Sequence, residues 1–350
     1  MARHLRGCRG DKRILSRASA FSYLSSLKAD GSLCVELAVE RQLSGGQVVR
    51  VASYAEADFV RGIGSRGGGS SDYNEQPATM RELLKGAPGE PGNFEMVVIT
   101  GTLDGIQRLN PRHRHDFDQI RMCLSGKVEW TPGNRTPPGC ITYFPAGCYY
   151  GPYGRQEEEH LHIQFEGPNG EPFIDYDSLR AARDALARKG SFDMGIYSWV
   201  DENGKVHKQD GHEANAEYAS GKKVEYPKPR FSAPITFDPR AFEWTSLGRG
   251  VQIKNLATLT ERETRIAMIR LNKASYGLTV PHQRSVLFVT EGSGTAGGQA
   301  IEERDGIVLE AGEEGLFETA TSLELLHLVF AKLPAGKAAA TAPAPARAGI

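Results

Sequence analysis

Short runs of apolar residues, broken at close intervals by glycine and proline, are the dominant pattern along the chain. In the first half these runs span 94–100, 119–124, 140–144 and 160–165. In the second half they span 265–271, 285–290, 306–309 and 323–330. Strands of this length with turn residues between them are typical of an antiparallel barrel or sandwich, not of alternating strand–helix units. The pattern therefore predicts two all-β regions.

Changes in composition divide the chain further. The expected parts are a mixed N-terminal extension (1–90), a first β region (91–170), a linker (171–232), a second β region (233–334) and a disordered Ala/Pro-rich tail (335–350). Within the extension, 77–85 has short helical character. In the linker, Ser178 can cap one helix that runs from Leu179 to about Lys189. The rest of the linker is polar and loop-like.

Composition and charge narrow the class of protein. Hydrophobic residues make up 39% and charged residues 24% of the 350 residues, which is ordinary for a soluble globular protein. The formal net charge is -1, so nothing points to a nucleic acid partner, and no apolar run approaches the length of a membrane-spanning helix. Five cysteines without C-x-x-C spacing suit a reducing compartment, so the cytoplasm is the expected location. We allow for a homodimer.

Four of the nine histidines form two H-x-H pairs. In the first pair, alternate side chains of a strand share a face, so His113 and His115 would point the same way. If the backbone stays extended beyond this pair, Gln119 and Arg121 would point to the same face as the two histidines. Two imidazoles projected from one strand into a narrow barrel make half of a metal site. Arg121 could then clamp a carboxylate inside the barrel, or it could lie on a solvent-facing strand or between two lobes.

The second pair can supply the other half of the site. His160, His162 and Gln164 form one polar face, opposite an apolar face of leucine, isoleucine and phenylalanine at 161, 163 and 165. An isolated H-x-H pair commonly lies on a solvent-exposed strand and has no special function. Together they favour a shared task, which is either a metal centre or a polar pocket whose histidines bind an organic ligand directly.

The spacing of these residues resembles the cupin superfamily, whose first motif reads G(X)5HXH(X)3–4E(X)6G. His113 and His115 match the HXH pair, Gln119 stands at the glutamate position, and Gly126 follows after six residues. The opening glycine is at best Gly105, two residues too far ahead of the pair.

The second cupin motif reads G(X)5PXG(X)2H(X)3N and is also matched in part. Gly139, Pro145 and Gly147 have its spacing, while Tyr150 and Gly154 replace the histidine and the asparagine. In the second β region, by contrast, His282 stands where the first histidine of an HXH pair would be, and Arg284 replaces the second. No further histidine follows until His327.

The resemblance implies an all-β protein of two cupin-type jelly-roll barrels, a bicupin, with one working barrel and a degenerate, structural one. It also implies one divalent metal ion: Fe, Mn, Ni, Cu or Zn. The assigned roles are metal ligation by His113, His115, Gln119 and one or both of His160 and His162, substrate binding by Arg121 and Gln164, and catalysis by Tyr150.

A metal held mainly by neutral imidazoles keeps most of its positive charge and favours an anionic or chelating substrate. The first hypothesis is therefore a metal-dependent enzyme of dioxygenase, isomerase or lyase type, acting on a small carboxylate or phenolic compound. The alternative is a non-enzymatic cupin that binds or senses a small molecule, its altered ligand set marking lost catalysis. A neutral Gln119 cannot act as a base in the way that a glutamate could.

Overall fold

The computed structural model describes residues 26–27, 33–34, 49–61, 79–87, 92–101, 109–110, 112–154, 157–166, 173–193, 195–259 and 264–331. The tail predicted to be disordered, 335–350, lies outside these residues. The chain forms two compact units, 1–46 and 47–350. In the first unit, β1 (Ser26–Leu27) and β2 (Leu33–Cys34) pair in antiparallel fashion.

The second unit contains both predicted β regions. The first is a seven-stranded sheet in the order β17-β11-β8-β13-β6-β5-β4. Its strands are β4 (Phe59–Arg61), β5 (Thr79–Lys85), β6 (Phe94–Gly101), β8 (Asp118–Gly126), β11 (Ile141–Phe144), β13 (Glu158–Phe165) and β17 (Ile235–Phe237). Two short sheets accompany it, β7 (Leu109–Asn110) with β12 (Tyr153–Gly154) and β9 (Val128–Thr131) with β10 (Asn134–Thr136).

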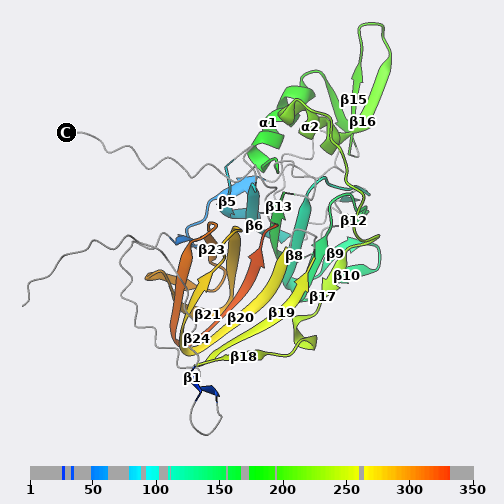
Figure 1. The fold of residues 1–350 in the computed structure, drawn as a ribbon. Coiled ribbons are helices and arrows are strands. Elements are labelled where there is room, and N and C mark those ends of the chain that lie inside the picture. Colours follow the sequence, from blue (N-terminus) through cyan, green and yellow to red (C-terminus); the bar gives the residue numbers. More distant parts are fainter. Residues whose placement is uncertain are drawn as a thin grey trace, which may run out of the picture. The chain divides into compact units, whose positions relative to one another are not determined.

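The second β region is an eight-stranded sheet in the order β18-β19-β20-β24-β21-β23-β3, with β22 paired to β21 (Figure 1). Its strands are β3 (Arg50–Ala52), β18 (Thr245–Gly248), β19 (Val251–Thr258), β20 (Arg265–Thr279), β21 (Ser285–Ala296), β22 (Gln299–Glu302), β23 (Gly306–Leu309) and β24 (Glu314–Val329). A short 3-10 turn, Pro239–Ala241, precedes it. Every strand pair of both sheets is antiparallel, as the alternating pattern predicted.

Part of the region expected to be an N-terminal extension joins these sheets. Strand β3 pairs with β23, and β4 and β5 extend the first sheet beyond β6. The helical character predicted within 77–85 is therefore wrong for the strand β5. Leu83 and Leu84 are both buried, and they are adjacent because the register shifts at a bulge between Glu82 and Leu84. A pair of neighbouring leucines imitates a helical pattern, and pairing with β6 overrides it.

One apolar core lies between the two sheets. Strand β13 contributes Leu161, Ile163 and Phe165 to it, and β24 contributes Leu326 and Leu328. The residues between them in sequence point to the opposite faces, because side chains alternate along a strand. In β13 those are His160, His162 and Gln164, so the apolar and polar faces predicted for this strand are confirmed.

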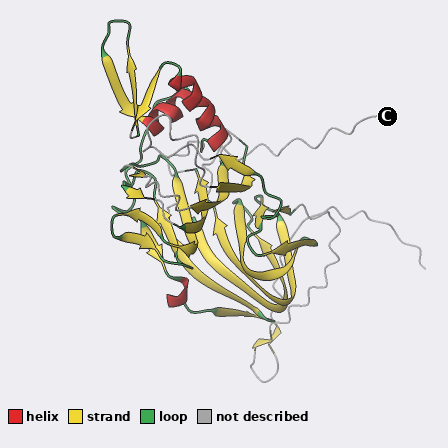
Figure 2. Ribbon diagram, turned by 180° about the vertical axis from the view of Figure 1, so that it is seen from behind, coloured by secondary structure: helices red, strands yellow, loops and turns green. Residues whose placement is uncertain are grey.

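The linker folds as a compact addition at one end of the first sheet (Figures 1 and 2). We call residues 173–221 the inserted module. It consists of α1 (Tyr176–Ala187), a three-stranded sheet of β14 (Gly190–Asp193), β15 (Ile196–Val200) and β16 (Val206–Asp210), and α2 (Gly211–Ser220).

Of these elements only α1 was predicted from the sequence. It begins three residues before the expected start because Asp175, not Ser178, is its N-cap and accepts a hydrogen bond from the Ser178 amide. The prediction of a loop-like remainder is wrong. Helix α2 escaped detection because its buried face is small and polar, with Gly211, His212, Ala214, Asn215 and Ala216 in place of a stripe of large apolar residues.

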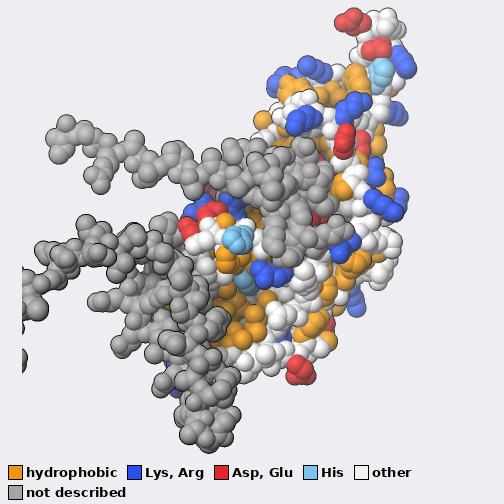
Figure 3. Space-filling model, viewed as in Figure 1, with side chains coloured by type: hydrophobic (Ala, Val, Ile, Leu, Met, Phe, Trp, Pro, Cys, Tyr) orange, Lys and Arg blue, Asp and Glu red, His pale blue; other side chains and the backbone are white. Residues whose placement is uncertain are grey.

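The described surface agrees with the balanced composition. On the face seen in Figure 3, Lys and Arg side chains are interspersed with Asp and Glu, in keeping with the net charge of -1. Within the part of the chain that the structure describes, no helix combines the length and the apolar character needed to cross a bilayer.

The inner face of the second sheet is apolar. The inward-facing side chains of β21 and β24 include Leu287, Val289, Leu323 and Leu325, which belong to one apolar cluster. His327 has the same parity on β24 and is buried, whereas His282 is exposed. The two histidines therefore differ in environment, and the structural role of this region stays a prediction.

Buried His327 should make the protein less stable in acid. Burial, with a smaller contribution from Arg265, lowers the pKa of His327 to about 4 from 6.5. As pH falls below the unfolded value, the unfolded chain takes up a proton that the folded chain does not, so stability falls between pH 6.5 and about 4 by up to about 3 kcal/mol. His327→Leu should remove most of this loss when urea unfolding is compared at neutral and acidic pH. An equal acid-induced loss in both proteins would contradict the prediction.

Candidate functional site

A cavity of about 130 Å³ lies between the polar face of the first sheet and the inserted module. The residues singled out from the sequence all line it: His113, His115, Gln119, Arg121, Tyr150, His160, His162 and Gln164. Nine further lining residues come from the inserted module. The structure thus brings the two H-x-H pairs and the second-motif tyrosine to one place.

The first H-x-H pair lies ahead of the strand that was expected to carry it. Strand β8 begins only at Asp118, and His113 instead forms an isolated bridge with Tyr150. The His113 amide donates to the Tyr150 carbonyl and the Tyr150 amide to the His113 carbonyl, each at 2.9 Å. The rings of His113 and Tyr150 are 4.3 Å apart between centroids. This bridge fixes the tyrosine beside the histidine pair, as the motif spacing implied.

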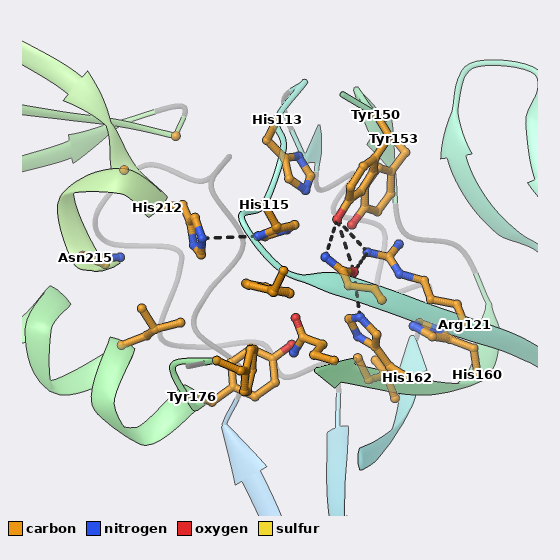
Figure 4. A pocket seen from close by; sticks show the side chains of 18 of the residues that line it. His113, His115, Arg121, Tyr150, Tyr153, His160, His162, Tyr176, His212 and Asn215 are labelled. Carbon is orange, nitrogen blue, oxygen red and sulfur yellow. Dashed lines mark hydrogen bonds between the residues drawn. The ribbon is translucent and has the colours of Figure 1, made fainter. Parts of the chain in front are cut away.

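Gln119 is at the centre of a buried polar network (Figure 4). Its Oε1 accepts a hydrogen bond from Arg121 Nη2 at 3.1 Å and lies 2.9 Å from His162 Nε2, which must donate because an amide oxygen only accepts. The Tyr150 hydroxyl accepts from Arg121 Nη2 at 3.1 Å and from Gln119 Nε2 at 3.2 Å. As a metal ligand, Gln119 would have to give up hydrogen bonds to its oxygen from Arg121, His162 and the Tyr150 hydroxyl.

Arg121 is a buried cation, with 5% of its surface exposed. Its guanidinium packs against the rings of Phe144, Tyr150 and Tyr153. Burial lowers the pKa of Arg121, but the neighbouring oxygens of Tyr153 and Tyr150 more than offset this, so the pKa lies above its usual value. Among the described residues no carboxylate forms an ion pair with it, and its Nε has no hydrogen-bond partner. This positive charge is therefore available to an anion in the cavity.

The other predicted polar residues lie farther along β13. His160 Nδ1 is 3.7 Å from Glu158 Oε1. Gln164 lies opposite Glu95 of β6. Burial raises the pKa of Glu95 well above its usual range, with Glu82 and Asp175 adding to the effect. Within the described part of the chain, Gln164 Nε2 has no hydrogen-bond partner and is free to donate to a ligand.

His212 of α2 is one of the cavity residues that the sequence reasoning missed. Its Nε2 lies 3.3 Å from His115 Nδ1 and 3.9 Å from Asp116 Oδ1. Figure 4 shows it facing His115 across the cavity. The available signal was Asp210 as a helix N-cap and Gly221 as a left-handed stop, which together delimit α2 and place His212 in its first turn.

Among the described residues no three His, Cys, Asp or Glu side chains form a group that could hold a metal ion, and His115 and His212 are a pair of suitable donors. Two imidazole nitrogens bound to one metal at about 2.0–2.1 Å with tetrahedral geometry are about 3.3 Å apart. The His115–His212 pair has that separation. The ring centroids of His113 and His115 are 5.1 Å apart, close to the roughly 5 Å of two rings on one metal. The metal roles of Gln119, His160 and His162 stay predictions.

Neither a family model nor a curated protein matches the chain at significance. Among solved structures, a candidate dioxygenase from Nostoc punctiforme aligns with a TM-score of 0.51 at 12% identity, covering 84% of this chain and 86% of that one. HEPD of Streptomyces albus, solved with 2-hydroxyethylphosphonate and Fe(II), aligns with a TM-score of 0.47 at 11% identity, covering 83% of this chain and 77% of that one. An oxalate decarboxylase variant of Bacillus subtilis aligns with a TM-score of 0.45 at 12% identity, covering 85% of this chain and 81% of that one.

At 12% identity and a TM-score of 0.51, the likeness to the Nostoc punctiforme structure speaks for the fold alone. It covers 84% of this chain, and the two antiparallel sheets agree with it. The partial motifs around His113 and Tyr150 agree as well. The chain therefore has an all-β fold of two antiparallel sheets, similar to that of the Nostoc punctiforme structure.

Proposed function

We propose that the protein is a metal-dependent enzyme that acts on a small anionic compound, a carboxylate or an acidic phenol. The observation that carries the proposal is Arg121. A buried guanidinium without a carboxylate partner among the described residues lies in the same cavity as a cluster of imidazoles. An unpaired buried charge costs several kcal/mol, which a bound anion would offset. A site that attracts both a cation and an anion suits a substrate held between metal and arginine.

Each residue has a role that follows from its contacts. The histidines around His115 would hold the metal, which supplies Lewis acidity or the capacity to activate dioxygen. Arg121 would bind one end of the anion through its free Nε and orient it toward the histidines. Gln164 can donate a second hydrogen bond from the floor of the cavity. The nitrogen-rich donor set is compatible with Fe, Mn, Ni, Cu or Zn.

Tyr150 is the residue best placed to move a proton. Its hydroxyl lies between Gln119 and Arg121, and its ring packs on His113. Gln119 cannot serve as a base, so proton transfer falls to Tyr150.

Loss of the Tyr150 hydroxyl should slow turnover without removing the metal. Tyr150→Phe keeps the ring that packs on His113 but deletes the group that exchanges a proton, so kcat should fall by about 100-fold or more. The screen would use protein loaded with each of the five metals and a panel of small carboxylates and catechols. Metal content of the two proteins should be equal.

The competing outcome is a binding protein. Tight, saturable binding across the panel with no product for any of the five metals would refute the enzyme and favour the non-enzymatic alternative. A Tyr150→Phe protein with unchanged kcat would leave the enzyme in place but overturn the role of the tyrosine.

A further inference from the structure

We propose that the substrate is an aromatic carboxylate with a single ring, and that the inserted module selects it by holding the ring while Arg121 holds the carboxylate. The inference rests on the proposed function, because it takes the anion site at Arg121 as given, and it adds the chemical class of the rest of the substrate. The inserted module thereby acts as the specificity element of the cavity.

The two sides of the cavity differ in polarity. The first sheet contributes polar side chains, among them Arg121 and Gln164. The inserted module contributes three large apolar ones, Phe173, Leu179 and Phe192, beside polar residues of α2. Figure 4 shows the helices of the module on one side of the cavity and Arg121 on the other. A pocket with an apolar wall and a few convergent polar groups fits a molecule that has a polar end and an apolar body.

Two of these apolar side chains are buried without belonging to a core. Phe173 and Leu179 are 2% and 3% exposed. Neither belongs to the apolar core between the two sheets, nor to the cluster inside the module that contains Leu186 and Phe192. Since both line the cavity, a bound ring would remove their remaining apolar surface from water. Burial of a group the size of a phenylalanine side chain strengthens binding by at least about 10-fold.

Helix α1 presents one face to the cavity. Tyr176, Leu179 and Arg183 are spaced by three and four residues, so they share a face of the helix, and all three line the cavity. The central carbon of the Arg183 guanidinium lies 4.1 Å from the centroid of the Phe192 ring, which ties β14 to α1. The wall that would meet the substrate ring is therefore built from regular elements and is preformed.

The surrounding side chains favour an aromatic ring over an aliphatic one. Phe117 and Phe173 meet edge to face, with centroids 4.9 Å apart and an interplanar angle of 87°. Both line the cavity, together with Tyr150 and Phe192. Aromatic pairs in edge-to-face or offset contact gain about 2- to 12-fold in affinity beyond the burial of their area. An aromatic acid should therefore bind more tightly than its saturated counterpart.

The volume of the cavity limits the substrate to one ring. The cavity measures about 130 Å³, close to the roughly 150 Å³ of an apolar protein cavity that admits benzene. A second, fused ring exceeds this volume. A bicyclic aromatic acid should therefore be excluded, whereas benzoate should bind.

The test is carboxylate binding to the full chain, read by NMR titration with acetate, benzoate, cyclohexanecarboxylate and 2-naphthoate. The native protein should bind benzoate at least about 10-fold more tightly than acetate and about 2- to 12-fold more tightly than cyclohexanecarboxylate. It should not bind 2-naphthoate. Leu179→Trp places an indole in the space for the ring, so the affinity for benzoate should fall to that for acetate, which itself stays unchanged.

Two further variants separate loss of the wall from loss of the fold. Leu179→Ala removes part of the wall without crowding the cavity. It should lower the preference for benzoate over acetate by at least about 4-fold, because it deletes more than one buried methylene. The matched control is Ala181→Trp, which adds the same indole to an exposed position of α1 and should change none of the affinities. Circular dichroism establishes which variants fold, and Leu179→Ala decides the matter if Leu179→Trp does not.

The outcomes distinguish this inference from the proposed function. Equal affinity of the native protein for acetate and benzoate, or a benzoate affinity that stays within about 3-fold in Leu179→Trp, overturns the role of the module and leaves the function standing. Binding of 2-naphthoate or cyclohexanecarboxylate as tight as that of benzoate overturns the restriction to a single aromatic ring. Native protein that binds none of the four acids overturns the anion site, the proposed function and this inference with it.

Discussion

His115→Ala is expected to lower metal affinity by more than about 100-fold, the largest single effect that we anticipate. His115 is the central imidazole of the cluster, within ring-contact distance of both His113 and His212. Its removal would delete a ligand of the proposed metal site, whereas changes to groups that merely orient ligands already cost about 10- to 100-fold. His113→Ala should act in the same direction. Metal content after purification without chelator, followed by calorimetric titration, provides the measurement.

The second barrel supplies the control for this prediction. His282 is exposed and His327 is buried in an apolar interior, so substituting either should leave metal content unchanged. Two equivalents of metal in the native protein, one of them lost on His282→Ala, would contradict the account of a structural second barrel. Metal retained in full by His115→Ala would contradict the site itself.

Arg121→Met should abolish most anion binding while leaving the metal in place. The change removes a buried charge and keeps a side chain of similar length. Truncating one partner of a buried charge pair costs about 2 kcal/mol or more, so affinity for a small carboxylate should fall at least about 30-fold. A purely structural arginine would instead destabilise the fold when removed. We expect the ligand-free variant to unfold at an equal or higher urea concentration, because the lost charge has no carboxylate partner among the described residues.

Arg114→Met is the matched control. Arg114 belongs to the same segment but lies over the rings of Tyr149 and Tyr226, outside the cavity. Its loss should leave carboxylate affinity unchanged. Equal affinity of the native and Arg121→Met proteins would refute the anion site, whatever the state of the metal.

The fold could be predicted from the sequence because its strands carry the alternation that buries one face. Strand β13 shows this directly: its apolar residues enter the core between the sheets and its histidines enter the cavity. Strand β5 could not be predicted, since the bulge beside Leu84 breaks the alternation. Pattern reasoning recovers regular strands and fails where pairing with a distant strand dictates the register.

The candidate site was predictable only in part. Spacing brought His113, His115 and Tyr150 together correctly, although a bridge between two irregular segments, not a strand, joins them. His212 could not be placed from spacing, because the inserted module reaches the cavity through tertiary packing that no local pattern encodes. The bonds that occupy Gln119 were equally hidden, since parity along a strand predicts which side chains share a face but not which of them form hydrogen bonds.

The central claim is that the imidazole cluster and Arg121 form one site that holds a metal and an anion together. The most direct test is the visible spectrum of the Co²⁺-loaded protein during titration with salicylate, which carries both a carboxylate and a phenol. We predict one Co²⁺ per chain, a saturable shift of the cobalt bands, and loss of that shift in Arg121→Met with the cobalt retained. Saturable salicylate binding that leaves the cobalt spectrum of the native protein unchanged would contradict the claim.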